Sequence, residues 1–263
     1  MKSLMSVNYK FMELSPKELI SIINEYNVDG VEIASNGIDH LKYLKDLAYE
    51  CFLRKKRFQI HGDSSLEVNK QIEFLKEIEN ISDMLGYKIN IVLHSIYDQD
   101  KQKSIEKTIE YTNKITESVD NSKLTITLEN LNDDKNVDRL NKEDILPILC
   151  NNDNLYFTYD VGHELSDQEC VMSTKEYIVP IIKNIHIHTN KNDHYSKTFD
   201  HQPIYKNDEN WNNLIKYITF LKLNNYDGPI VYEYDLYALE GETIKEKVIN
   251  YAKSIAYFQE RYK

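Results

Sequence analysis

The chain has few of the residues that mark disulfide-bonded or membrane-spanning proteins. Its three cysteines, Cys51, Cys150 and Cys170, are widely spaced and form no CxxC pair, so we expect reduced thiols and no disulfide framework. No stretch approaches the ~20 apolar residues of a membrane helix, and the first residues lack the apolar block of a secretion signal. We therefore expect a cytoplasmic protein with no membrane partner.

Positive charge is also scarce. The net charge is −11, from 43 acidic and 32 basic residues, and only four of the basic residues are arginine. Nucleic-acid binding depends on Lys and Arg that neutralise phosphates, so we expect no nucleic-acid partner. The sequence contains no GxGxxG, Walker or GxSxG motif, which argues against dinucleotide-binding, P-loop and serine-hydrolase chemistry.

Glycine and proline are too few, at seven and five, to form a flexible linker. Short apolar segments instead alternate with longer segments of helical periodicity, which is typical of a parallel α/β domain. Eight strand–helix units can be counted along the chain, and this number favours a closed (β/α)₈ barrel over a doubly wound open sheet. We predict an α/β fold with a single TIM-barrel domain over residues 1–263.

The bounds of several elements follow from local signals. Ser15-Pro16-Lys17-Glu18 predicts a helix start, with Ser15 as N-cap and Pro16 in the first turn. Apolar patterns predict a first strand within 6–12, helices at about 38–56, 142–149, 175–183 and 211–223, and a long polar loop over 190–208.

Six of the apolar segments end on a histidine or a carboxylate. They are QIHGDS with His61, IVLHSI with His94, ITLENL with Glu129, FTYDVGH with Asp160 and His163, IHIHTN with His186 and His188, and IVYEYD with Glu233. One such histidine alone is more often structural. Because parallel barrel strands point their carboxyl ends at a common face, where these barrels carry their active sites, six in register predict an enzyme site.

Four of these residues predict a divalent metal cofactor: Glu129, Asp160, His188 and Glu233. Carboxylates and imidazoles buried together without a cation would repel each other or stay unsatisfied. Mixed nitrogen and oxygen ligands suit Mn²⁺ or Zn²⁺, with Co²⁺ and Fe²⁺ as alternatives.

Several motifs resemble those of the sugar phosphate isomerase/epimerase family, a branch of the xylose isomerase-like barrel superfamily that also includes endonuclease IV. They are LEN at 128–130, DVGH at 160–163, HIHTN at 186–190 and YDGPIVYE at 226–233, and the resemblance extends over most of the chain from VEIASN onward. It implies that Glu129, Asp160, His188 and Glu233 bind one divalent metal. The second histidine of HIHTN matches the family's ligand, so we prefer His188 to His186.

The resemblance also implies roles for the remaining polar residues. His61 and His94 would line the sugar pocket or belong to a multi-metal cluster, His163 would bind substrate or a second metal, and His186 would support the site. Glu32 in GVEI would contact substrate or form a structural ion pair. A second metal would use His61, His94, His163 and His201, but Asp200 and His201 are adjacent where the nucleases carry DxH, which counts against three metals.

Three functions remain in order of preference. The first is a metal-dependent isomerase or epimerase of a small-molecule sugar or sugar derivative, in which Glu129 and Glu233 act as base and acid around an ene-diolate. The second is an endonuclease IV-like multi-metal phosphodiesterase or other hydrolase. The third is a non-catalytic sugar-binding barrel. A homodimer is the default oligomeric state.

Overall fold

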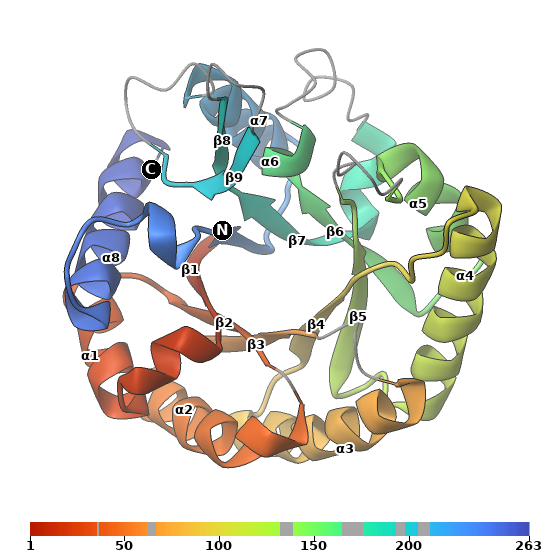
Figure 1. The fold of residues 1–263 in the computed structure, drawn as a ribbon, viewed down its shortest axis with the longest axis horizontal. Coiled ribbons are helices and arrows are strands. Elements are labelled where there is room, and N and C mark those ends of the chain that lie inside the picture. Colours follow the sequence, from red (N-terminus) through yellow and green to blue (C-terminus); the bar gives the residue numbers. More distant parts are fainter. Residues whose placement is uncertain are drawn as a thin grey trace.

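Eight parallel strands close into a barrel, and α1–α5, α7 and α8 lie around it, whereas the one-turn helix α6 lies at its rim beside β7 and β9 (Figure 1). The structure is a computed structural model that describes residues 1–35, 37–62, 67–131, 139–164, 176–192, 198–204 and 211–262. The strands follow the order β1-β10-β7-β6-β5-β4-β3-β2 around the barrel. The predicted α/β barrel is therefore confirmed.

The barrel strands are four to six residues long. They are β1 (Lys2–Val7), β2 (Gly30–Ala34), β3 (Arg57–His61), β4 (Ile89–Leu93), β5 (Leu124–Glu129), β6 (Leu155–Asp160), β7 (Ile182–Ile187) and β10 (Pro229–Tyr232). The α-helices are α1 (Pro16–Glu25), α2 (Leu41–Leu53), α3 (Val68–Leu85), α4 (Lys101–Ser118), α5 (Lys142–Leu149), α6 (Val161–Glu164), α7 (Trp211–Leu223) and α8 (Ile244–Tyr262). None of the helices among the described residues has the length and apolar character needed to cross a membrane.

Helix ends form where the sequence supplies capping groups. At the start of α1, the Ser15 hydroxyl accepts a hydrogen bond from the Glu18 backbone, and the Glu18 carboxylate accepts one from the Ser15 backbone. This capping box satisfies amide groups that have no partner inside the helix. Asn141 and Asp144 form the same arrangement at α5, and Gly86 ends α3 in the left-handed conformation.

Three predicted ranges are wrong: the strand within 6–12, the helix at 175–183 and the loop over 190–208. The first strand is Lys2–Val7 and not 6–12, because the Asn8 side chain accepts a hydrogen bond from Lys10 N and starts a 3₁₀ helix, η1 (Tyr9–Glu13). The segment predicted as a helix at 175–183 forms a 3₁₀ helix, η3 (Glu176–Ile181), and the start of β7. Pro180 within it lacks the amide hydrogen that an α-helix would use.

The segment 190–208 is also more regular than a polar loop. Strands β8 (Thr189–Asn192) and β9 (Thr198–Gln202) pair there as an antiparallel sheet, and residues 193–197 and 205–208 lie outside the described part. The helix predicted over 38–56 begins as a 3₁₀ turn, η2 (Ile38–His40), and continues as α2. The helices predicted at 142–149 and 211–223 are confirmed.

The apolar core lies between the barrel wall and the helices. Alternate residues of each strand point to opposite faces, and the outward series, such as Ile89, Ile91 and Leu93 of β4, is fully buried under the helices. The inward series is largely polar instead. Its members include Gln59 and His61 of β3, Thr127 and Glu129 of β5, Thr158 and Asp160 of β6, and Asn184 and His186 of β7, all nearly or fully buried.

Replacing Ser15 with alanine tests the capping box. Ser15→Ala should lower the free energy of unfolding by about 1 kcal/mol, because the Glu18 amide loses its acceptor. Urea denaturation followed by circular dichroism measures the change. Ser21→Ala is the matched control, because Ser21 is exposed in the same helix and alanine has the higher helix propensity. Equal destabilisation by both substitutions would show that the cap contributes nothing.

Candidate active site

All the sequence-predicted residues except Glu32 gather at the carboxyl end of the barrel. His61, Glu129 and Asp160 are the last residues of β3, β5 and β6, whereas His94 and Glu233 directly follow β4 and β10. His186 lies in β7 beside Asp160 of β6 in the strand register, and His188 lies just beyond it. His201 lies in β9 of the β8–β9 sheet.

Four of these residues form one group, which we call the His186 group: His61, Glu129, His186 and Glu233. His186 Nδ1 lies 2.7 Å from Glu129 Oε1 and 2.8 Å from Glu233 Oε2. The other Glu129 oxygen contacts His61 Nε2 at 3.2 Å and His94 Nε2 at 2.9 Å. Glu129 therefore joins three imidazoles, and His186 joins the two glutamates.

The remaining four residues form a second group, the His188 group: Asp160, His163, His188 and His201. Asp160 contacts His188 Nε2 at 3.2 Å through Oδ1 and His163 Nδ1 at 3.3 Å through Oδ2. The His201 ring stacks on the His188 ring with centroids 4.4 Å apart. The two groups adjoin, because Asp160 Oδ2 lies 3.9 Å from His186 Nδ1 and His201 Nε2 lies 3.9 Å from Glu233 Oε2.

The ligand set expected from sequence is thus divided between the two groups. Glu129 and Glu233 meet His186, whereas Asp160 meets His188. His94 touches the His186 group through Glu129 but keeps a side-chain exposure of 29 %, so it lies toward the barrel mouth. His163 is almost buried and belongs to the His188 group.

Glu32 lies deeper in the barrel, below the two groups. Its carboxylate is fully buried and sits 3.0 Å from His186 Nε2 through Oε1. Gln59 Nε2 and Asn184 Nδ2 both donate to the other oxygen of Glu32, and Gln59 also donates to Asn184 Oδ1 at 3.1 Å. A carboxylate that holds the far nitrogen of an imidazole fixes the orientation of the ring. The Asn184 amide lies 2.9 Å from the same ring nitrogen. Glu32, through its charge, and Asn184, through this contact, together position His186.

Sequence reasoning missed Gln59, Asn184 and Asn130. Strand periodicity could have identified Gln59 and Asn184, because each lies two residues before a histidine of the site and so on the same face of its strand. Asn130 is the last residue of LEN, and its amide exchanges hydrogen bonds with the backbone of Asp160 at 2.8 and 2.9 Å. The backbone carbonyl oxygen of Asn130 also lies 2.9 Å from His163 Nδ1. Asn130 thereby fixes the carboxylate and the imidazole of the DVGH segment.

Gly162 makes room for the His188 ring. A Cβ atom at this position would lie 2.3 Å from two atoms of the imidazole, a distance that no side chain can occupy. The DVGH segment therefore needs glycine at its third residue for steric reasons.

Mutual charge fixes the protonation of the His186 group when no cation is present. Burial opposes charge on His61, but its hydrogen bond with Glu129 and the charges of Glu129 and Glu233 raise its pKa to about 9. His186 is likewise buried, and the surrounding glutamates raise its pKa well above the usual value. Burial acts to raise the pKa of Glu129 and Glu233, yet the charge of His186 and its hydrogen bonds lower both pKa values.

The two groups have the donor chemistry of a divalent-metal site. Ligand atoms about 2.0–2.2 Å from one ion lie at most about 4.4 Å apart, and within each group the four candidate atoms lie within 4.8 Å of one another. Asp160 Oδ2 and Glu233 Oε2 are buried, and each lies near an imidazole nitrogen, at 3.3 and 2.8 Å, without a well-aligned hydrogen bond. Buried carboxylate oxygens without such a bond are expected where a cation binds. The residues therefore fit Mn²⁺ or Zn²⁺.

The stability of the metal-free protein should depend on pH. The pKa of His61 is about 9 in the folded state against 6.5 in the unfolded chain. Its contribution is therefore present below pH 6.5 and is lost as the pH rises through 9, by an amount on the order of 3 kcal/mol. Urea denaturation of chelated protein at pH 6.5, 7.5 and 9 measures this loss.

Two controls accompany this measurement. His61→Gln removes the titrating group and should flatten part of the pH dependence. Metal-loaded protein should melt at a higher temperature and respond less to pH, because a cation bound only to the folded state stabilises it and replaces the protons. A free energy of unfolding that is constant from pH 6.5 to 9 in chelated protein would contradict the assigned charges.

A comparison with family models identifies the family of the chain. The model of the xylose isomerase-like TIM barrel family matches residues 13–257. No curated protein matches the chain by sequence. Among solved structures, the 3-keto-D-glucoside 4-epimerase of E. coli superposes with a TM-score of 0.71 at 16 % identity, covering 99 % of both chains.

Two further structures show the same fold. The D-psicose 3-epimerase of Clostridium cellulolyticum H10 has a TM-score of 0.68 at 12 % identity and covers 100 % of this chain and 98 % of its own. A sugar phosphate isomerase/epimerase of Parabacteroides distasonis has a TM-score of 0.64 at 18 % identity, with 98 % and 96 % covered. With its closed barrel and a family match over nearly its whole length, the chain belongs to the xylose isomerase-like TIM barrel family.

Proposed function

We propose that the protein is a divalent-metal-dependent isomerase or epimerase of a small sugar or sugar derivative. The observation that carries this proposal is the meeting of Glu129 and Glu233 at His186 Nδ1, at 2.7 and 2.8 Å. Two carboxylates at the mouth of one barrel supply the base and the acid that proton transfer at a carbon needs. The sugar epimerases among the structural neighbours support the same chemistry.

The two glutamates reach the site from different parts of the wall. In one direction around the barrel, β5 and β10 are separated by β6 and β7, and in the other by β1–β4. Glu129 and Glu233 can therefore address different faces of a bound sugar. One glutamate removes the proton next to the carbonyl and keeps it, and the other, which is protonated at that point, delivers its own proton to the opposite face. The configuration at that carbon is thereby inverted, and solvent exchange restores the two carboxyl groups.

A metal would be held by Glu129, Glu233 and His186, with Asp160 adjacent at 3.9 Å from His186. When bound, a divalent cation lowers the pKa of the proton next to the carbonyl by Lewis acidity. Among the described residues, His94, His201 and Glu233 keep side-chain exposures of 29, 30 and 18 % at the mouth. Within the described part of the chain, these three site residues are open to a sugar that enters the barrel.

Solvent isotope exchange tests the proposed reaction. Metal-loaded protein incubated in D₂O with a panel that includes D-fructose, D-psicose and D-tagatose should incorporate deuterium at the carbon beside the carbonyl of at least one sugar. Glu233→Gln should lower this rate by about 10²-fold or more, because an amide cannot accept the proton. The readout is nuclear magnetic resonance of the sugar, with Asp235→Asn as the control from the same segment. A folded, metal-loaded Glu233→Gln protein with wild-type turnover would remove Glu233 from the mechanism.

A second candidate function is a multi-metal hydrolase similar to endonuclease IV. One observation favours it: the His186 and His188 groups each bring four ligand residues within metal-binding reach, and they adjoin at 3.9 Å. Paired metals are typical of enzymes that cleave phosphodiesters. The net charge of −11 opposes it, because DNA binding depends on cationic side chains.

Metal content and DNA incision distinguish the two candidates. The isomerase predicts one metal per chain, lost in His186→Ala and retained in His188→Ala, because His186 contacts both glutamates. This order reverses the preference for His188 drawn from sequence. Elemental analysis gives the stoichiometry, and an abasic-site duplex assayed at low salt should show no incision. Two or more metals together with metal-dependent incision, and no deuterium exchange, would favour the hydrolase.

A further inference from the structure

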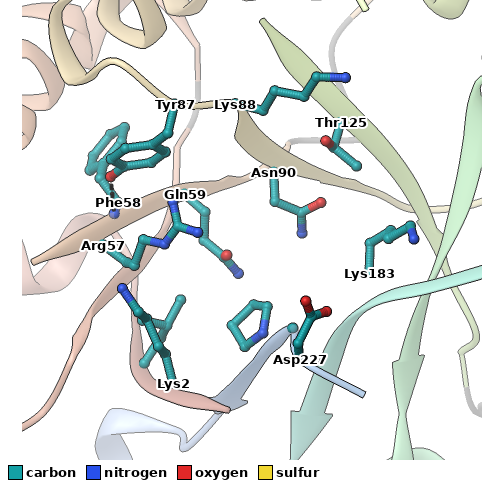
Figure 2. A pocket seen from close by; sticks show the side chains of 13 residues that line it. Lys2, Arg57, Phe58, Gln59, Tyr87, Lys88, Asn90, Thr125, Lys183 and Asp227 are labelled. Carbon is teal, nitrogen blue, oxygen red and sulfur yellow. Dashed lines mark hydrogen bonds between the residues drawn. The ribbon is translucent and has the colours of Figure 1, made fainter. Parts of the chain in front are cut away.

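A cavity of about 310 Å³ lies at the amino end of the barrel, opposite the candidate active site (Figure 2). Residues at the starts of the strands line it, among them Lys2 of β1, Arg57 of β3, Asn90 of β4, Thr125 of β5 and Pro229 of β10. Strands β3, β4 and β5 each carry a residue that lines this cavity and, on the same face at or directly after the strand end, a residue of the candidate active site. Arg57 and His61 lie on one face of β3, Thr125 and Glu129 on one face of β5, and Asn90 and His94 on that of β4.

The lining is cationic. It includes four cationic residues, Lys2, Arg57, Lys88 and Lys183, and one carboxylate, Asp227, in a chain whose net charge is −11. The Lys183 ammonium also donates a hydrogen bond to Pro180 O at 2.9 Å. None of the four cations forms an ion pair within the part of the chain that the structure describes. The guanidinium of Arg57 packs over the Tyr87 ring at 4.4 Å, which holds it in place at the cavity wall. Figure 2 shows these side chains around the hollow.

The Asn90 side chain distinguishes this cavity from a surface that merely carries solvated lysines. Both polar atoms of its amide are buried, and neither has a hydrogen-bond partner. Buried amides are nearly always satisfied, and one that is not calls for a ligand or water. Gln59, the other amide in the lining, is instead held by Glu32 and Asn184.

We propose that this cavity binds a small phosphate-bearing molecule. Arg57 offers the planar fork that matches phosphate oxygens, and the lysines add point charges around it. The volume is about ten times the ~30 Å³ share of one water and falls at the lower end of the range for ligand pockets, so it can hold more than a bare phosphate ion. The Asn90 amide, which is covered in this structure, would turn into the cavity to bind a hydroxyl or carbonyl of the same ligand. This site is independent of the proposed function.

Calorimetric titration of metal-loaded protein tests the site. Inorganic phosphate and glycerol 1-phosphate serve as probes and glycerol as the uncharged control, all at low salt. Saturable binding of one phosphate probe and no binding of glycerol are expected. Tighter binding of the ester indicates a phosphorylated metabolite, and tighter binding of phosphate indicates the free ion.

Variants locate the binding to the cavity. The double variant Lys88→Gln/Lys183→Gln should weaken the binding about tenfold or more, because charge-assisted hydrogen bonds are lost. Lys42→Gln/Lys253→Gln is the matched control, since both lysines are exposed away from the cavity, and its affinity should be unchanged. Asn90→Asp keeps the shape of the side chain and adds a negative charge, so it should also weaken binding.

Two results would overturn the proposal. Equal affinity in the wild type, the cavity variants and the control would place the phosphate elsewhere, for instance at the metal. The absence of saturable binding for every phosphate probe would show that the cavity is a solvated cationic surface. Circular dichroism melting of each variant establishes that the comparisons are made between folded proteins.

Discussion

The interior of this barrel is organised around one buried imidazole, His186. Its two ring nitrogens face three carboxylates, with Glu129 and Glu233 at one nitrogen and Glu32 at the other. Charges removed from water are tolerated only when they are paired and hydrogen-bonded. The polar side chains inside the wall follow from this constraint, since Gln59 and Asn184 satisfy Glu32 while His61 and His94 satisfy Glu129.

The same constraint explains why the site lies on strands and not on long loops. Each charged group must keep its partners within about 3 Å, and a parallel ladder holds backbone positions more firmly than a loop does. The outward faces of the strands are apolar and pack under the helices. Consequently most strands have one face that stabilises the fold and one face that carries polar groups, whereas β10 is apolar on both faces and is followed by Glu233.

The sequence predicted the barrel and the gathering of polar residues at one end of it because both follow from simple periodicities. Alternating apolar segments give eight strands, and residues at strand ends converge at one face. The division of these residues into the His186 group and the His188 group was not predictable. His186 and His188 lie two residues apart and so share a face of the chain, but their height against Asp160 depends on a register shift between β6 and β7 at Phe157/Thr158. A single sequence contains no information on such a shift. The polar interior at Gln59 and Asn184 was missed because only strand ends were considered.

The polar column inside the barrel has a consequence for how proteins of this design can evolve. In many TIM barrels the interior is filled with branched aliphatic side chains. The same residues then both stabilise the fold and form the bottom of the active site. Here the aliphatic packing is an outer shell, and Gln59, Glu32, Asn184 and His186 form a hydrogen-bonded core within it. Mutational drift in the shell alters stability without touching the inner groups. A single change among the inner groups leaves a buried polar partner unsatisfied, so new chemistry would have to arise through coordinated substitutions.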